Sequence, residues 1–440
     1  MVSNLEQAGI PAVAITLEDM SQVAENYRRQ IRMPDMRNIV VPRMTSPEKS
    51  KASAPGLLPK LVAALTTPLT DREQREETIP KEVFPRIVVT GTWDECQEYF
   101  QGGPDWTALF TTAPPARFTK GQPVVLPTEE KVRWMLTGTS HKADEIMGPV
   151  PVPADQREFT VETVAISAVM AGCKPEYMPI LLAMAEMMST PAKTRVSSRL
   201  GGAHQLLGVV SGPIGKELGL STEQFSGAGY YANYSMRIAM DMIGRNAIGH
   251  WGVRAEASSG CFAEDIDQSP WTPLGVDAGF KPGDNVFALC VANSPNERWI
   301  SPAWYRAYGK FLERMVPVIQ EQGNSLTVTI IIHPSVANDL AARGMSKEDV
   351  KQWLWEQATE TMGHYRDRTW YGIMTALQTR PGPFNRAEIF DLPNDAIIHT
   401  FKNPEMIQII VAGIPMEFGY VAGGPMWLPS ELMTSIDKWR

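Results

Sequence analysis

Residues 165–188 read AISAVMAGCKPEYMPILLAMAEMM, and this stretch predicts two apolar helices separated by a short break. The break falls at Gly172, because a helix commonly stops where glycine can adopt a positive φ. Pro175 suits the first turn of the second helix, where its missing N–H would have no partner in any case. Apolar helices of this kind, together with the buried strands predicted elsewhere, indicate an α/β protein.

Cys173 lies just ahead of the second helix, with Lys174 beside it and Glu176 in the first turn. The helix dipole and a nearby cation both favour a thiolate, so we predict a lowered pKa and a reactive thiol here. The alternative is that Cys173 is a small core residue, as most cysteines in apolar surroundings are.

The composition is that of an ordinary soluble globular chain, with 440 residues, 43 % hydrophobic and 20 % charged. The formal net charge of −8 argues against a nucleic-acid-binding protein, which needs a basic face. No run approaches the ~20 apolar residues of a membrane helix, and the first residues lack a secretory signal, so we expect a cytoplasmic protein. The four cysteines show no CxxC spacing, which favours free thiols over a disulfide framework.

The N-terminal residues have a strand–helix–strand pattern, with strands at 10–15 and 37–42 and a helix at 18–31. Such a βαβ unit requires parallel strands. Two strands alone do not make a stable sheet. The missing strands must therefore come from later in the chain or from another polypeptide.

The larger C-terminal part alternates predicted strands with predicted helices. The strands are expected at 84–91, 206–211, 285–291, 326–332 and 407–413, and the helices at 93–100, 231–243, 304–320, 335–343 and 347–361. Residues 209–223 and 330–349 share an order of strand, X-Pro, helix, glycine and serine before an acidic helix start. This similarity predicts an internal repeat, although any β-turn-α unit can look alike.

Cys261 is the second candidate thiol, and it stands shortly before the carboxylates Glu264, Asp265 and Asp267 in a segment predicted to be a loop. Carboxylates could act as acid or base there, or hold a hard cation. They would also raise the pKa of the thiol through like charge. The alternative is an acidic, solvated loop closed by Trp271.

The cofactor and metal signals are weak. The six histidines show no HxH or HExxH spacing, so zinc receives no support from the pattern, although a metal ion remains open. The GxGxxA match at 227–232 lacks a strand ahead of it, and no cofactor is predicted. His333 follows a predicted strand, which is a frequent place for functional groups in α/β folds and an equally suitable place for a structural histidine.

The chain resembles the UGSC family, a little-characterised bacterial family named for a selenocysteine- or cysteine-Gly-Ser-Cys signature. Its members often join a small α/β domain carrying that signature to a larger domain, and residues 9–42 resemble the second half of the small domain. The larger domain is resembled by GQPVVLPTEE (121–130), VMAGCKPEY (169–177), CFAE (261–264), SPWTPL (269–274), NPE (403–405) and IIVAG (409–413).

The resemblance implies a divided protein, because the first half of the small domain and its Gly-Ser-Cys motif are missing here. Ser259-Gly260-Cys261 does not replace that motif, since it belongs to the larger domain's pattern. We therefore predict that a separate small polypeptide completes the N-terminal sheet and carries the Gly-Ser-Cys thiols. We also expect an oligomer.

The predicted fold is α/β, with a partial flavodoxin-like βαβ unit and a larger two-lobed α/β domain. The expected boundaries are 1–44 for the partial unit, 45–80 for a linker with a short helix at 57–65, and 81–440 for the large domain with its internal repeat.

The first functional hypothesis is an enzyme that uses thiol redox or nucleophilic chemistry to change a carbon–heteroatom bond in a small molecule. It would be a thiol-dependent oxidoreductase, or a lyase or transferase. The expected catalytic residues are Cys173, Cys261, Glu264 and Glu176, and the expected substrate-binding residues are Tyr177, Trp271 and His333.

Two alternatives remain. One is a metal-dependent hydratase, hydrolase or lyase that uses Cys261, Glu264, Asp265 and a histidine. The other is a non-catalytic subunit that binds a small thiol or selenol protein.

Overall fold

The computed structural model describes most of the chain and divides it into two compact units. The described residues are 10–18, 21, 28, 35–42, 47–74, 86–101, 124–149, 158–189, 204–222, 234–240, 242–243, 260–293, 298–300, 310–321, 326–369, 374, 377–379, 382–413, 419–424 and 432–440. Unit 1 comprises Met1–Val88 and Val150–Glu158, and unit 2 comprises Val89–Pro149 and Phe159–Arg440.

Unit 1 contains the predicted parallel strand pair. Strand β1 (Ala14–Leu17) pairs in parallel with β2 (Asn38–Val41), and helices α3 (Pro47–Thr66) and α4 (Asp71–Gln74) follow. Arg37 ties the start of β2 to these helices, since its guanidinium donates to the Ala64 carbonyl at 2.5 Å and pairs with Glu73 at 2.7 Å. Most of the helix predicted at 18–31 lies outside the described residues, so the flavodoxin-like order remains a prediction.

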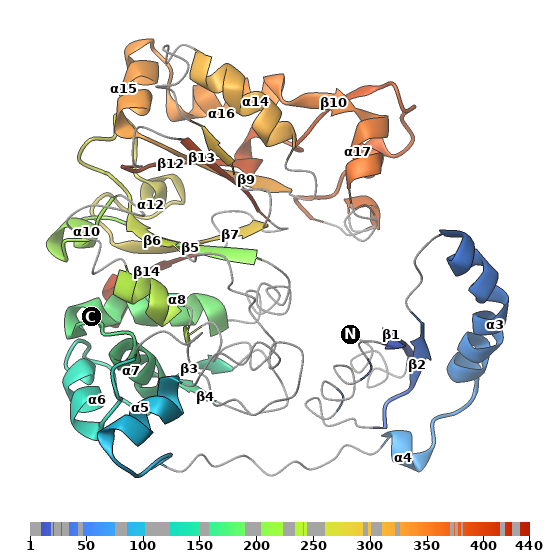
Figure 1. The fold of residues 1–440 in the computed structure, drawn as a ribbon. Coiled ribbons are helices and arrows are strands. Elements are labelled where there is room, and N and C mark those ends of the chain that lie inside the picture. Colours follow the sequence, from blue (N-terminus) through green and yellow to red (C-terminus); the bar gives the residue numbers. More distant parts are fainter. Residues whose placement is uncertain are drawn as a thin grey trace. The chain divides into compact units, whose positions relative to one another are not determined.

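Unit 2 contains helices and strands in alternation (Figure 1). Its first half holds α5 (Trp93–Gln101), α6 (Glu129–Leu136), β3 (Ile146–Pro149), β4 (Glu158–Thr160), α7 (Val161–Met170), the 3-10 turn η3 (Pro175–Tyr177), α8 (Met178–Ser189), β5 (His204–Ser211), α10 (Ile214–Glu217), β6 (Gly260–Ala263), α12 (Leu274–Asp277), β7 (Val286–Asn293) and β8 (Arg298–Ile300). Its second half holds α14 (Phe311–Gln320), β9 (Thr327–Ile332), α15 (Pro334–Ala342), α16 (Lys347–Gln357), β10 (Thr359–Thr361), α17 (Met362–Arg368), the 3-10 turn η5 (Ala387–Ile389), β11 (Ile397–His399), the 3-10 turn η6 (Pro404–Met406), β12 (Ile407–Val411), β13 (Gly419–Gly424), β14 (Met433–Ser435) and the 3-10 turn η9 (Asp437–Trp439).

Two four-stranded sheets lie face to face at the centre of unit 2, between two layers of helices (Figure 1). The core between the sheets joins Leu207, Val209 and Phe262 of the first sheet to Ile331 and Ile410 of the second. Helices α14, α15 and α16 cover the outer face of the second sheet, and α7 and α8 lie on the side of the first. The chain is therefore an α/β protein, in which helices close both outer faces of paired sheets.

The two sheets have the same strand topology, and they exchange their fourth strands. In the first sheet β5 pairs in parallel with β6 and antiparallel with β7, which pairs antiparallel with β14. In the second sheet β9 pairs in parallel with β12 and antiparallel with β13, which pairs antiparallel with β8. Strand β8 follows β7 in the chain yet pairs with β13, whereas β14 follows β13 and pairs with β7. A duplicated unit would produce this arrangement, and duplication itself remains a prediction.

The element boundaries have local causes. Thr160 and Ser346 each form a capping box at the start of α7 and α16, and Thr128 caps α6 as predicted. The β-branched run of β9 is buried on both faces, as expected of a strand packed between a second sheet and helices. Helix α8 is apolar on all sides and is buried on all sides where its side chains are described.

Two predicted elements differ from the structure. Residues 86–91 of the strand predicted at 84–91 form no strand, and Ile87 and Val88 are exposed, because an apolar run needs a partner strand to satisfy its backbone. The helix predicted at 347–361 ends at Gln357, since Thr359–Thr361 pair with β11 as β10. Helix propensity is a weak preference that such pairing overrides. The helix predicted at 57–65 starts earlier, at Pro47.

Candidate functional site

Cys173 lies in the turn between α7 and α8. Gly172 ends the first helix with a φ of 73°, and the backbone N–H of Cys173 donates to the Ala168 carbonyl at 2.9 Å. Pro175 then starts the 3-10 turn η3 that leads into α8. The predicted helix break is therefore present at the predicted residues, and it directs the Cys173 thiol inward, where the residue is 4 % exposed.

Cys261 belongs to strand β6 rather than to a loop, which corrects the sequence-based prediction. Side chains alternate along a strand, and the neighbouring Phe262 packs into the core between the two sheets. Cys261 therefore points to the opposite face, which α7 and α8 cover. Its thiol is close enough to Cys173 for its charge to raise the pKa of that group.

A serine completes this buried cluster. The side chain of Ser235, in the helical stretch 234–240, hydrogen-bonds the Cys173 thiol. Ser235 is 1 % exposed, and Cys261 is 2 % exposed. Three chain segments that are far apart in sequence thus place two thiols and one hydroxyl together on the helical side of the first sheet. We call Cys173, Ser235 and Cys261 the thiol cluster.

The electrostatics of the thiol cluster contradict the predicted thiolate. Burial raises the pKa of Cys173 to about 12, even though the Ser235 hydrogen bond lowers it. Burial also raises the pKa of Cys261 to about 12. Lys174 is exposed and points its charge to solvent, where water screens it, so the desolvation of the thiolate outweighs the expected helix-start effect. Both cysteines are thiols at neutral pH.

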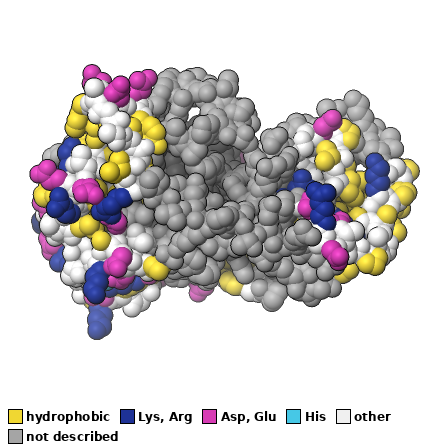
Figure 2. Space-filling model, turned by 90° about the horizontal axis from the view of Figure 1, so that it is seen from below, with side chains coloured by type: hydrophobic (Ala, Val, Ile, Leu, Met, Phe, Trp, Pro, Cys, Tyr) yellow, Lys and Arg dark blue, Asp and Glu magenta, His cyan; other side chains and the backbone are white. Residues whose placement is uncertain are grey.

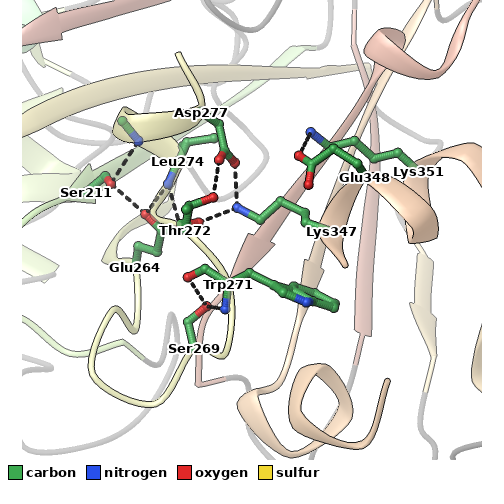
Figure 3. Close-up of polar contacts among 11 residues, drawn as sticks. Ser211, Glu264, Ser269, Trp271, Thr272, Leu274, Asp277, Lys347, Glu348 and Lys351 are labelled. Carbon is green, nitrogen blue, oxygen red and sulfur yellow. Dashed lines mark hydrogen bonds and ion pairs between the residues drawn. The ribbon is translucent and has the colours of Figure 1, made fainter. Parts of the chain in front are cut away.

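Glu264 follows Cys261 by three residues but lies in a different environment (Figure 3). Its carboxylate accepts from the Ser211 hydroxyl at 2.6 Å and from the Leu274 backbone N–H at 2.9 Å. The Gly275 N–H donates in turn to Ser211 Oγ at 3.2 Å. Burial raises the pKa of Glu264, while the Ser211 hydrogen bond and the charge of Lys347 oppose that rise. The carboxylate therefore holds the loop after β6 against the start of α12.

Lys347 extends this network toward the second sheet's helices (Figure 3). Its ammonium donates to the Thr272 carbonyl at 2.6 Å and pairs with Asp277 at 2.6 Å. Thr272 also donates its hydroxyl to Asp277. Lys347 is 1 % exposed, and a buried charge of this kind is tolerated because it is paired and hydrogen-bonded. We call Glu264, Ser211, Lys347, Asp277 and Thr272 the Glu264 network.

The other predicted site residues do not converge on the thiol cluster. Glu176 is exposed, whereas Tyr177 is buried next to α8. Trp271 donates its indole N–H to the Met345 carbonyl at 3.1 Å and packs against the core of the second sheet. His333 caps α15, and its Nδ1 accepts from the Ser335 N–H at 3.2 Å. Trp271 and His333 thus lie on the second sheet's side of the unit, away from the two cysteines.

The geometry gives the metal alternative no set of ligands. Cys261 and Glu264 lie in separate environments, and Asp265 accepts from the side chain of Gln268 at 2.9 Å. Within the described part of the chain, no three His, Cys, Asp or Glu side chains are grouped to hold a metal ion.

Sequence reasoning missed three residues of these clusters. Ser211 directly follows a strand, and this position is the one signal that could have drawn attention to it. Lys347 reads as an exposed first residue of a helix, and nothing local indicates its burial. Ser235 lies in a helix whose apolar pattern hides a single buried hydroxyl. The partners of all three come from distant segments.

The described surface has no broad field of one charge on the face seen in Figure 2, where basic and acidic side chains are interspersed. Among the described helices, none combines the length and apolar character needed to cross a membrane. Comparison of the chain with protein-family models, with curated proteins and with solved structures gave no match.

Proposed function

We propose that this chain belongs to a thiol-dependent enzyme in which Cys173 and Cys261 form a redox pair that acts on a small molecule. The observation that supports this is the meeting of two free thiols from a helix break and a distant strand. A structural role alone would not require both residues to be cysteines with a shared hydroxyl neighbour. The raised pKa values fit thiols that stay reduced until substrate arrives.

The proposed reaction is a two-electron reduction. The two thiols give up two electrons and two protons and end as a disulfide. A carbon–heteroatom bond R–X accepts them and becomes R–H and H–X, so that atoms and electrons balance. The enzyme would then need an external thiol reductant to restore the pair.

The pair is tested by oxidation of the native protein with diamide, followed by non-reducing peptide mapping. We expect a disulfide between the peptides of Cys173 and Cys261. The variants Cys173→Ser and Cys261→Ser should each abolish it. Cys290→Ser is the matched control, because Cys290 is equally buried, has a pKa raised to about 12 and lies between the two sheets beside Gln408. If the disulfide never forms, or forms equally well in Cys173→Ser, the proposed function is wrong.

We also propose that unit 1 binds a small polypeptide, which completes its sheet and carries the Gly-Ser-Cys thiols. In the described residues, β1 pairs with β2 alone. Ile15 and Val40 are 52 % and 46 % exposed, an unusual exposure for strand residues of this type. Two strands need further strands or helices for stability.

Hydrogen exchange tests this binding role. In the isolated chain, the backbone amides of β1 and β2 should exchange quickly, and addition of the Gly-Ser-Cys polypeptide should slow them. Full protection of both strands in the chain alone would contradict the proposal.

A further inference from the structure

The helix that carries Ser235 covers the face of the first sheet to which Cys261 points. Gly208 is the register partner of Cys261 on β5, and a Cβ atom at Gly208 would lie 3.4 Å from Met240 Sδ of the same helical stretch. Met240 and Met236 are fully buried there. The position of Ser235 beside the two thiols is therefore set by packing on the sheet, independently of its hydrogen bond.

The two thiols differ in their polar surroundings. The Ser235 hydroxyl donates to Cys173 and opposes the effect of burial on that group. In the described part of the chain, burial alone acts on Cys261. A hydrogen bond to a charged acceptor is roughly twice as strong as one to a neutral acceptor. The hydroxyl consequently favours the thiolate form of Cys173 over that of Cys261.

We propose that Ser235 is a positioning residue that makes Cys173 the attacking thiol of the pair and leaves Cys261 to resolve the intermediate. This inference rests on the proposed function, because it assigns an order to the same two thiols. Cys173 loses its proton, its sulfur bonds to X, and the R–X bond breaks while R takes up a proton. The Cys261 sulfur then attacks the Cys173 sulfur, the S–X bond breaks, and X leaves with the Cys261 proton as H–X.

The test is the rate of alkylation by iodoacetamide at each cysteine, measured by peptide mapping across a pH series. In the native protein Cys173 should react faster than Cys261 and Cys290. Ser235→Ala should slow Cys173 by about three- to tenfold, which is the range of one ordinary hydrogen bond, and should move its pH profile upward. Ser235→Thr keeps the hydroxyl and should restore the rate and the profile.

Thr329→Val is the matched control, because Thr329 hydrogen-bonds the buried Cys290 as Ser235 does Cys173. This variant should leave Cys173 unchanged. The inference is overturned if Cys261 reacts first in the native protein, a result that needs no variant, or if Ser235→Ala retains the native profile. A diamide-induced disulfide that still forms in Ser235→Ala with an unchanged order of rates would overturn the inference alone, whereas failure of the disulfide in the native protein overturns the proposed function.

Discussion

At the scale of single residues, Glu264 is the buried acid on which the loop after β6 depends. Glu264→Ala would leave the Ser211 hydroxyl and the Leu274 N–H without their acceptor. Each unsatisfied buried group costs roughly 1–3 kcal/mol, so we expect the free energy of unfolding to fall by about 2–4 kcal/mol. Denaturant titration measures this loss.

Two variants serve as controls for Glu264→Ala. Glu264→Gln keeps an acceptor for Leu274 and should cost much less. Asp267→Ala lies in the same loop and breaks an exposed pair with Lys216, which should cost less than about 1 kcal/mol. Equal losses for Glu264→Ala and Asp267→Ala would show that the Glu264 network does not stabilise the loop.

The pH dependence of Glu264 has a defined sign. Burial raises its pKa above the ordinary value of 4.5, so the folded chain binds this proton more tightly than the unfolded chain. Its contribution to stability is therefore complete below that ordinary value and is lost as the pH rises through the folded value. Stability of Glu264→Gln, measured against pH, should lack this loss. An identical pH profile for the native protein and Glu264→Gln would exclude it.

At the scale of elements, the end of α6 is pressed against the turn that carries Cys173. A Cβ atom at Gly138 would clash with the backbone carbonyl of Pro175. Because backbone atoms cannot give way as a flexible side chain can, Gly138→Ala should separate α6 from η3 at a cost of about 1–3 kcal/mol. The Cys173 thiol should then be alkylated faster, since the turn that buries it is displaced.

Gly56→Ala is the control for this prediction, because Gly56 lies within α3 with nothing within 4 Å of its added Cβ. That change should leave stability equal or raise it by about 0.5–1 kcal/mol, as alanine is the better helix former. Native stability and native Cys173 reactivity in Gly138→Ala would contradict the proposed contact.

At the scale of the whole of unit 2, the exchange of β8 and β14 makes each half depend on the other. A chain cut between Ile300 and Lys310 yields two fragments, each with three strands of one sheet and the fourth strand of the other. Each fragment alone exposes one face of the core between the sheets. We expect neither to unfold cooperatively by itself and both to form a folded complex when refolded together. Calorimetry of each fragment and of the mixture checks this, and a cooperative transition in either fragment alone would contradict it.

The sequence by itself determined the local features of this protein. Gly172 and Pro175 ended one helix and started the next, Thr128 capped α6, and the β-branched run of β9 formed a buried strand. These outcomes depend on backbone freedom, missing N–H groups and side-chain shape, which are properties of neighbouring residues. The parallel pairing of β1 and β2 followed from the same strand–helix–strand pattern.

Only the tertiary structure decided what surrounds the chemically important side chains. Cys173 has the predicted helix-start position, yet burial raises its pKa, and Cys261 lies in a strand whose partner is set by β5. Ser235 and Lys347 gain their partners from segments far away in sequence. Desolvation and strand pairing depend on which distant segments pack together, and a local pattern carries no information about them.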